Sequence, residues 1–142
     1  MNCQGGIEKM YGTSIGLKPQ NSAMIISKIK KGLPVGAFEK LRKNLDVSEK
    51  ALSKVLNIAI TTLTRRKSAG RLSFEESERL FRLACLYDKA VEVFEDPQLA
   101  RKWLKEPSWA LGDVTPLQYA DTELGTQEVE DLLGRIEHGV FS

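Results

Sequence analysis

Hydroxyl and cationic side chains are concentrated in the segment ITTLTRRK, residues 60–67. Threonine hydroxyls can donate hydrogen bonds to phosphates or base edges, and lysine and arginine neutralise phosphate charge. The chemistry that this segment offers is therefore noncovalent recognition of a nucleic acid. The residues selected as candidates for it, in this segment and beside it, are Lys50, Lys54, Ile60, Thr61, Thr62, Thr64, Arg65, Arg66, Lys67 and Arg71.

The stretch from residue 46 to residue 67 predicts two short helices joined by a tight turn. Asp46 or Ser48 can cap the first helix by accepting hydrogen bonds from its free N–H groups. Asn57 suits the turn because asparagine tolerates a positive φ, and Leu63 is expected to be buried by the second helix. A helix, a short turn and a cationic helix are typical of a helix-turn-helix. An αα-hairpin with a solvated basic face is the alternative.

The charge of the chain is divided between its two halves. Residues 28–71 hold 12 Lys or Arg against 3 acids, a net of +9, whereas residues 72–142 hold 7 against 15, a net of −8. A basic half that contains a helix-turn-helix would attract a phosphate backbone. The acidic half would be repelled by it and is expected to face a protein. Lys28, Lys30 and Lys31 are interpreted as a solvated face, with phosphate contact as the alternative.

Apolar spacing predicts bracing helices before the helix-turn-helix. Residues 1–20 are rich in glycine without a sustained period, and a flexible arm is expected there. Asn21 or Ser22 can cap a short helix, and Pro34 opens another. The apolar face expected for the first of these helices consists of Met24, Ile25, Ile26 and Ile29.

Ser73 and Glu76 form a capping-box pattern that predicts a long helix over residues 73–94. Its apolar residues form two adjacent stripes, so it must be covered on two sides. The core of a single chain is the preferred interpretation, and a dimer interface is the alternative. The stripes are Leu80, Ala84, Tyr87, Val91 and Phe94, and Leu83, Leu86, Ala90 and Val93.

Three further helices are predicted to follow Asp96, Thr115 and the pair Gly125–Thr126. The last of them carries Val129, Leu132, Leu133 and Ile136 on one face. Val140 and Phe141 are apolar, lie beyond this helix and are not needed to complete its face. They are expected to contact a partner. A Phe141 side chain folded back on the last helix is the alternative.

The sequence gives little support for catalysis. The single histidine, His138, has no Ser or Cys nucleophile beside it in an obvious motif. Cys3 and Cys85 stand too far apart to form a ligand pair, so neither a disulfide framework nor a metal site is indicated. We therefore expect no enzyme, no metal and no cofactor. The chain also lacks a membrane-spanning apolar run and a signal peptide, which predicts a cytoplasmic protein without a membrane partner.

The runs RLSFEESERLFRLA and DPQLARKWLKEPSWALGDVTPLQYADTELGTQEVEDLLGRIEHGVF resemble the Xre/MbcA/ParS family of antitoxins. The similarity covers roughly residues 45–141 and is most specific in the C-terminal region. The residues that carry it there are Trp103, Leu104, Pro107, Ala110, Leu111, Gly112, Thr115, Pro116, Leu117, Thr122, Gly125, Val129, Leu132, Leu133, Gly134, Arg135, Ile136, His138 and Gly139.

The resemblance implies an antitoxin encoded beside a RES-domain toxin, an enzyme that consumes NAD. The C-terminal domain would hold the toxin and obstruct its active site, while the helix-turn-helix would bind the operon's own promoter. Val140 and Phe141 are the expected anchors, and an inhibitory contact within residues 109–117 is the alternative. The full set of candidates for toxin binding is Trp103, Trp109, Leu117, Glu123, Arg135, Glu137, His138, Val140 and Phe141.

Two departures from the family's pattern affect these expectations. Asp113 stands where the family usually has glycine, and Ala59 and Ile60 stand where it usually has a polar residue at the start of the recognition helix. Because neither Ala59 nor Ile60 can donate to a phosphate, weaker DNA binding is expected.

The predicted architecture is all-α. It consists of a flexible arm (residues 1–20), a helix-turn-helix DNA-binding domain (residues 21–72), and a long helix that leads into a small helical toxin-binding domain (residues 73–142). One helix-turn-helix reads only a few base pairs, so a homodimer on operator DNA is expected. The alternative function is a stand-alone transcriptional regulator with a helical dimerisation domain.

Overall fold

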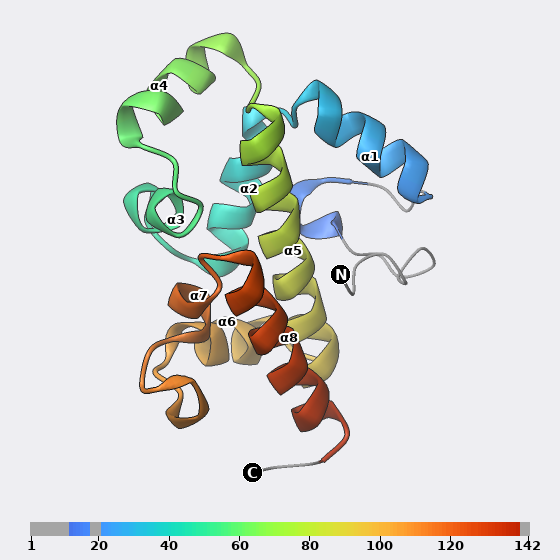
Figure 1. Ribbon diagram of the computed structural model, residues 1–142, viewed down its shortest axis with the longest axis vertical. Coiled ribbons are helices and arrows are strands. Elements are labelled where there is room, and N and C mark those ends of the chain that lie inside the picture. Colours follow the sequence, from blue (N-terminus) through green and yellow to red (C-terminus); the bar gives the residue numbers. More distant parts are fainter. Residues whose placement is uncertain (1–11, 18–20, 140–142) are drawn as a thin grey trace.

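A computed structural model describes residues 12–17 and 21–139. A long helix, α5 (Phe74–Phe94), passes through the middle of the molecule (Figure 1). Four helices precede it: α1 (Ser22–Lys31), α2 (Val35–Leu45), α3 (Glu49–Val55) and α4 (Ile60–Ala69). Three follow it: α6 (Pro97–Lys105), α7 (Pro116–Tyr119) and α8 (Glu123–Glu137). The described residues also form two 3-10 turns: η2 (Thr13–Ile15) and η3 (Trp109–Leu111). The described residues form α-helices and 3-10 turns but no strand, which confirms the all-α prediction.

The start of α5 is fixed by the capping box that the sequence predicts. The Ser73 hydroxyl accepts a hydrogen bond from the Glu76 backbone N–H at 3.1 Å, and the Glu76 carboxylate accepts one from the Ser73 N–H at 2.9 Å. Both apolar stripes of α5 are covered within one chain, because α1, α2 and η2 contact the helix and so do α6 and α8. This confirms the core interpretation. No helix of the described residues is long and apolar enough to cross a bilayer.

The helix-turn-helix forms as predicted. Ser48 caps α3 by accepting a hydrogen bond from the Ala51 N–H at 3.0 Å. Asn57 adopts a φ of 57° in the turn, and the Leu63 side chain of α4 is buried in the core. At the start of α4 the N-cap residue Ala59 makes no side-chain hydrogen bond, so the first N–H groups of this helix lack a side-chain cap.

Helix α1 is less buried than its sequence suggests. Asn21 caps it as expected, but only Ile29 is buried, and the side chains of Met24 and Ile26 remain 52% and 50% exposed. Successive residues of a helix point about 100° apart, so a single neighbouring helix cannot cover residues 24, 25 and 26 together. The expected apolar face is therefore wrong for Met24 and Ile26.

Residues 12–17 are packed, which differs from the flexible arm expected for residues 1–20. Turn η2 contacts α2 and α5, and both Ile15 in this turn and Leu17 just after it are buried. The Gly12 N–H donates to the Asp88 carboxylate at 2.6 Å. A segment this short cannot show a hydrophobic period, so the sequence gives no signal of the packing. Most of the expected arm lies outside the described residues.

Helix α8 begins earlier than predicted, at Glu123 instead of after Gly125 and Thr126. Thr122 caps it by accepting a hydrogen bond from the Gly125 N–H at 2.9 Å. Gly125 is needed for the close approach of α8 to the end of α7, because a Cβ atom there would lie 1.9 Å from the carbonyl oxygen of Tyr119. The sequence predicts a helix boundary at this glycine, whereas the structure shows that it marks a close contact between the backbones of α7 and α8.

Replacing Gly125 with alanine should therefore destabilise the protein. The added methyl group must push α8 away from the end of α7, and overpacking of this kind costs about 1–3 kcal/mol or more. Gly134→Ala is the matched control, because a Cβ atom at this second glycine of α8 meets nothing within 4 Å. The control should stabilise α8 by roughly 0.5–1 kcal/mol. Chemical denaturation measures both changes, and equal values for the two variants would contradict the packing argument.

Asp88 is a largely buried carboxylate on α5. Burial raises its pKa from 3.8 to about 6, although hydrogen bonds from Gly12 and Ser14 oppose the rise. Between pH 3.8 and about 6 the folded state therefore binds a proton more readily than the unfolded state. In this window the stability that depends on Asp88 increases as the pH falls, and above it the buried charge lowers the free energy of unfolding.

Asp88→Asn should thus stabilise the protein at pH 7.5, because the amide still accepts from Gly12 and carries no charge. The gain should be at most about 3 kcal/mol and should shrink as the pH falls through 6 towards 4. Thermal unfolding at a series of pH values measures it. Asp121→Asn, at an exposed carboxylate, is the control and should show no comparable trend. A gain that stays constant with pH would contradict the titration of Asp88.

Candidate functional site

The outward face of α4 carries the groups that the sequence predicts for nucleic-acid recognition. Thr61, Thr64 and Arg65 are exposed on it, and Ile60 at its first turn is 45% exposed. The Arg65 guanidinium donates to the Thr62 hydroxyl at 3.2 Å, which holds its side chain along the helix surface. The Thr64 hydroxyl donates to the carbonyl of Ile60 at 3.0 Å and keeps its acceptor capacity for a ligand.

Arg66 has a different environment from Arg65. Its guanidinium donates to both carboxylate oxygens of Glu76, at 2.8 and 3.2 Å, and only 6% of Glu76 is exposed. Burial acts to raise the pKa of Glu76, but the bonds from Arg66 and Ser73 outweigh it and lower the pKa. Arg66 therefore joins α4 to the start of α5, a structural contact that its sequence pattern does not indicate.

The remaining cations of this domain are spread over several surfaces. Lys67 forms an ion pair with Glu49 and so links α4 to α3. Arg71 donates to the carbonyl of Gly32 at 2.7 Å, beside the first turn of α2. Lys50 is exposed near the start of α3, whereas Lys54, in the same helix, lines a groove that faces α7.

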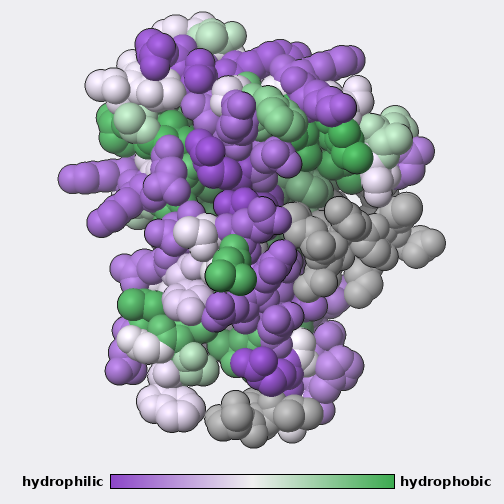
Figure 2. All heavy atoms as spheres, in the orientation of Figure 1, coloured by the Kyte–Doolittle hydropathy of each residue, from purple (hydrophilic) through white to green (hydrophobic). Residues whose placement is uncertain are grey.

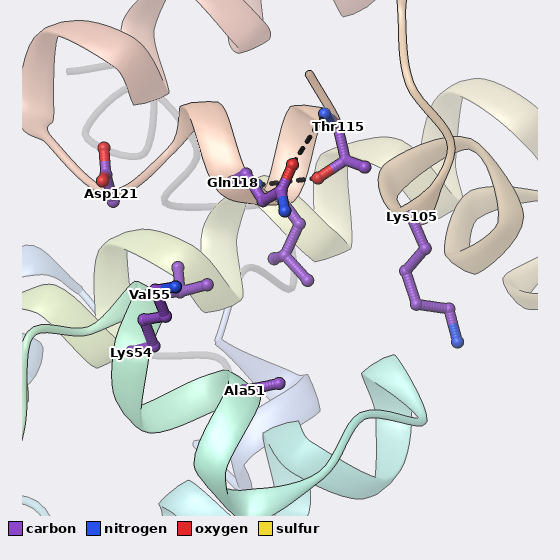
Figure 3. Close-up of a pocket in the computed structure, with 8 residues that line it drawn as sticks. Ala51, Lys54, Val55, Lys105, Thr115, Gln118 and Asp121 are labelled. Atoms are coloured by element: carbon purple, nitrogen blue, oxygen red, sulfur yellow. Dashed lines mark hydrogen bonds between the residues drawn. The ribbon is translucent and has the colours of Figure 1, made fainter. Parts of the chain in front are cut away.

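That groove separates the helix-turn-helix from the C-terminal helices and holds about 300 Å³ (Figure 3). Ala51, Lys54 and Val55 line it from α3, and Thr115 and Gln118, joined by their capping bonds, line it from α7. Two hydrogen bonds outside this group of lining side chains join the helix-turn-helix to the C-terminal helices. Asn57 donates to the carbonyl of Asp121 at 3.3 Å, and Lys105 donates to that of Asp46 at 3.0 Å.

A second groove, of about 410 Å³, lies on the C-terminal helices between η3 and α8. We call it the α7–α8 groove, and its apolar lining residues are Leu111, Val114, Tyr119 and Leu124. Leu124 is 66% exposed, and Trp109, in the adjoining turn η3, is 79% exposed. Hydrophobic side chains are visible over this part of the molecule (Figure 2). Asp121 and Glu128 also line the groove, so it joins apolar surface to negative charge.

The predicted protein-binding residues occupy three different environments. Trp103 is half-buried, with its ring centroid 5.7 Å from that of Phe94, and packs against the core, whereas Leu117 is buried within it. Trp109 alone of the apolar candidates within the described ranges is highly exposed. Charged or polar candidates are exposed along α8 and at its end: Glu123, Arg135, Glu137 and His138. Val140 and Phe141 lie outside the described residues.

Val114 and Leu124 are not among the binding residues predicted from the sequence. Leu124 has a recognisable signal, since it is an apolar residue on the side of α8 opposite the face formed by Val129 and Leu133. Val114 has none, because its exposure depends on the turn made by Gly112 and Asp113. Asp113 adopts a φ of 68°, a left-handed conformation that aspartate tolerates, which explains why it can replace the family's usual glycine.

Residues 24–84 match the family described as "Antitoxin Xre-like helix-turn-helix domain". Residues 89–139 match the "Antitoxin Xre/MbcA/ParS C-terminal toxin-binding domain". Antitoxin Xre of Yersinia enterocolitica is 35% identical over 130 residues, which cover 90% of this chain and 88% of the relative. The chain belongs to the Xre family of type II antitoxins.

Two further relatives extend the comparison. Antitoxin Xre of Photorhabdus laumondii is 33% identical, with 91% of this chain and 88% of the relative covered. A protein of a Sphingobium species named Prs ADP-ribosylating antitoxin is 30% identical, with 82% of this chain and 80% of the relative covered. In the antitoxin described here, the two matched regions meet between residues 84 and 89, inside α5. The boundary that we predicted, between residues 72 and 73, lies before this helix.

The two neighbouring arginines of the antitoxin should respond differently to replacement. Arg66→Ala leaves the buried Glu76 carboxylate without its cationic partner and should cost about 1–3 kcal/mol of stability. Arg65→Ala should change stability by no more than about 0.5 kcal/mol. It should instead weaken DNA binding and reduce the salt dependence by about one slope unit if one phosphate contact is lost.

Chemical denaturation and DNA titrations at several salt concentrations measure these effects. Adding Glu76→Gln to Arg66→Ala should restore part of the lost stability, because the amide can keep the capping bond without a buried charge. Equal loss of DNA affinity at unchanged stability in both single variants would show that Arg66 contacts phosphate.

Proposed function

We propose that this antitoxin neutralises a RES-domain toxin that consumes NAD, and that it represses its own operon. The observation that carries the proposal is the separation of two surfaces. The exposed face of α4 lies near the start of α5, and the α7–α8 groove lies on the helices that follow α5 (Figure 1). Because the two surfaces do not overlap, DNA and toxin can be bound at the same time. Both partners are expected in the cytoplasm.

On the toxin side, the α7–α8 groove supplies the docking surface. Trp109 and Leu124 are large, exposed and apolar, and a few such anchors usually dominate the affinity of an interface. The acidic residues beside them suit a cationic surface of the kind that a pocket for a dinucleotide diphosphate presents. Complementary charge would speed the encounter more than it tightens the complex. The residues from 138 onward would then reach the active site of the toxin.

On the DNA side, α4 enters the major groove and the antitoxin binds as a homodimer. Arg65 and the threonine hydroxyls of α4 contact phosphates or base edges. The operator is an inverted repeat whose half-sites are separated by about one helical turn or a multiple of it. The lack of a polar cap at Ala59 and of a polar group at Ile60 lowers the affinity of each half-site, which makes a dimer more important.

Co-expression with the gene next to the antitoxin gene tests the toxin side. Leu124→Glu places a charge in the α7–α8 groove, and should abolish both complex formation and the rescue of growth. Leu99→Glu is the matched control, since Leu99 is also exposed, at 49%, on α6 but does not line the groove. Both variants should stay folded and bind DNA. Full neutralisation by Leu124→Glu would show that the toxin docks elsewhere.

A chain that ends at Glu137 separates docking from inhibition in the same assay. We expect it to fold and to bind DNA, but not to block the loss of NAD or to restore growth. Full neutralisation by the shortened chain would move the inhibitory contact upstream, to residues 109–117. If no neighbouring toxin is bound by the unmodified antitoxin while operator DNA is, the chain acts as a stand-alone regulator.

A further inference from the structure

A cationic cavity lies on the other side of the helix-turn-helix domain from α3. It holds about 360 Å³ and is formed by η2, α1, the first turns of α2 and the link between α4 and α5. Four cationic side chains line it: Lys28, Lys31, Lys40 and Arg71. None of the described lining residues carries a carboxylate. We call this site the α1–α2 cavity.

Several backbone features keep these cations around one space. Arg71 is held at the rim by its bond to the carbonyl of Gly32. The Lys40 ammonium lies against Gly16, where a Cβ atom would come within 2.5 Å of its Nζ. Gly36 lines the cavity in the first turn of α2, and a Cβ atom there would meet nothing within 4 Å. The glycines thus leave room both for Lys40 and for a ligand.

The electrostatics of the cavity favour an anion. Four like charges around one space repel one another unless a counter-charge is present. The N-terminus of α2, an 11-residue helix, adds the positive end of its dipole, and its N-cap residue Pro34 makes no side-chain hydrogen bond to the helix. Phosphate is a well-suited occupant, because its oxygens accept charge-assisted hydrogen bonds from lysine and arginine.

The position of the cavity indicates the source of the phosphate. Arg71 directly follows Gly70, the residue that ends α4, and the carbonyl of Gly70 accepts from the Val35 N–H at 3.0 Å. The cavity is therefore continuous with the C-terminal end of the recognition helix. Helices α1 and α4 both lie at the end of the molecule where α5 begins (Figure 1). The net charge of −8 belongs to residues 72–142 and would keep DNA away from the other end.

We propose that the α1–α2 cavity binds a backbone phosphate of operator DNA just outside the base pairs that α4 reads. Lys28 and Lys31 neutralise it from α1, Lys40 from α2, and Arg71 donates from the rim. The site extends the contact with DNA beyond the recognition helix and offsets the weak start of α4. It rests on the proposed binding of DNA by α4, and the experiment separates the two.

The test uses the full chain and duplexes from the region upstream of its own gene. Lys28→Gln/Lys31→Gln should weaken binding several-fold and make the salt dependence shallower by about one to two slope units. Lys30→Gln/Lys102→Gln is the matched control, because it removes the same charge at exposed lysines that do not line the cavity. The control should change binding much less. Equal loss of affinity in the two double variants would overturn the proposal and would show that these lysines attract DNA only through the overall positive charge.

Duplex length gives a second, independent measure. The short duplex ends at the outermost base pairs of the two half-sites, and the long one adds about five base pairs, roughly 17 Å, at each end. The unmodified antitoxin should bind the long duplex more tightly, and Lys28→Gln/Lys31→Gln should lose that gain. An equal gain for both proteins would overturn the proposal.

Two further measurements complete the design. Arg65→Ala is titrated in parallel. If this variant binds every duplex as the unmodified antitoxin does, the proposed binding of DNA by α4 is wrong. If Arg65→Ala weakens binding but Lys28→Gln/Lys31→Gln does not, only the proposal for the α1–α2 cavity is overturned. Calorimetry with inorganic pyrophosphate tests whether the cavity binds a free phosphate compound instead of DNA. Binding that Lys28→Gln/Lys31→Gln abolishes, with DNA affinity unchanged, would assign the cavity to a free phosphate compound.

Discussion

Both halves of the structure depend on the hydrogen bonds that the Glu76 carboxylate accepts. It accepts the Ser73 N–H and so fixes the first turn of α5, and it accepts two bonds from Arg66 and so fixes the end of α4. A buried carboxylate is stable only when such donors surround it. Because the same group serves a helix start and a helix–helix contact, the recognition helix and the central helix are positioned together.

This arrangement gives the molecule a polarity along α5. Basic helices gather around the beginning of α5, and the acidic helix α8 packs alongside it, so the DNA-facing and protein-facing surfaces suit different partners. The groove between α3 and α7 separates them, and hydrogen bonds from Asn57 and Lys105 cross between the two sides. The common helix, more than direct contact between α3 and α7, holds the two surfaces in place.

The features that the sequence predicted well are those decided by a few neighbouring residues. Ser48, Ser73 and the Thr115–Pro116 pair act as caps whose partners lie within four positions, so their chemistry is visible in the chain. The features it did not predict depend on contacts between different elements. The pairing of Arg66, the burial of Leu117 and the contact of Gly125 with the Tyr119 carbonyl all require elements to be brought together, which no local pattern encodes.

The continuity of α5 through both matched regions bears on how such antitoxins can exchange parts. A recombination that joins the DNA-reading half of one relative to the C-terminal half of another must cut inside a helix that is buried on both sides. The new helix would have to satisfy two sets of packing partners at once, one from each parent. Exchange should therefore succeed where the junction preserves the residues of α5 that face each half. New pairings of operator and toxin are thus limited by side-chain shape inside α5 as well as by the two binding surfaces.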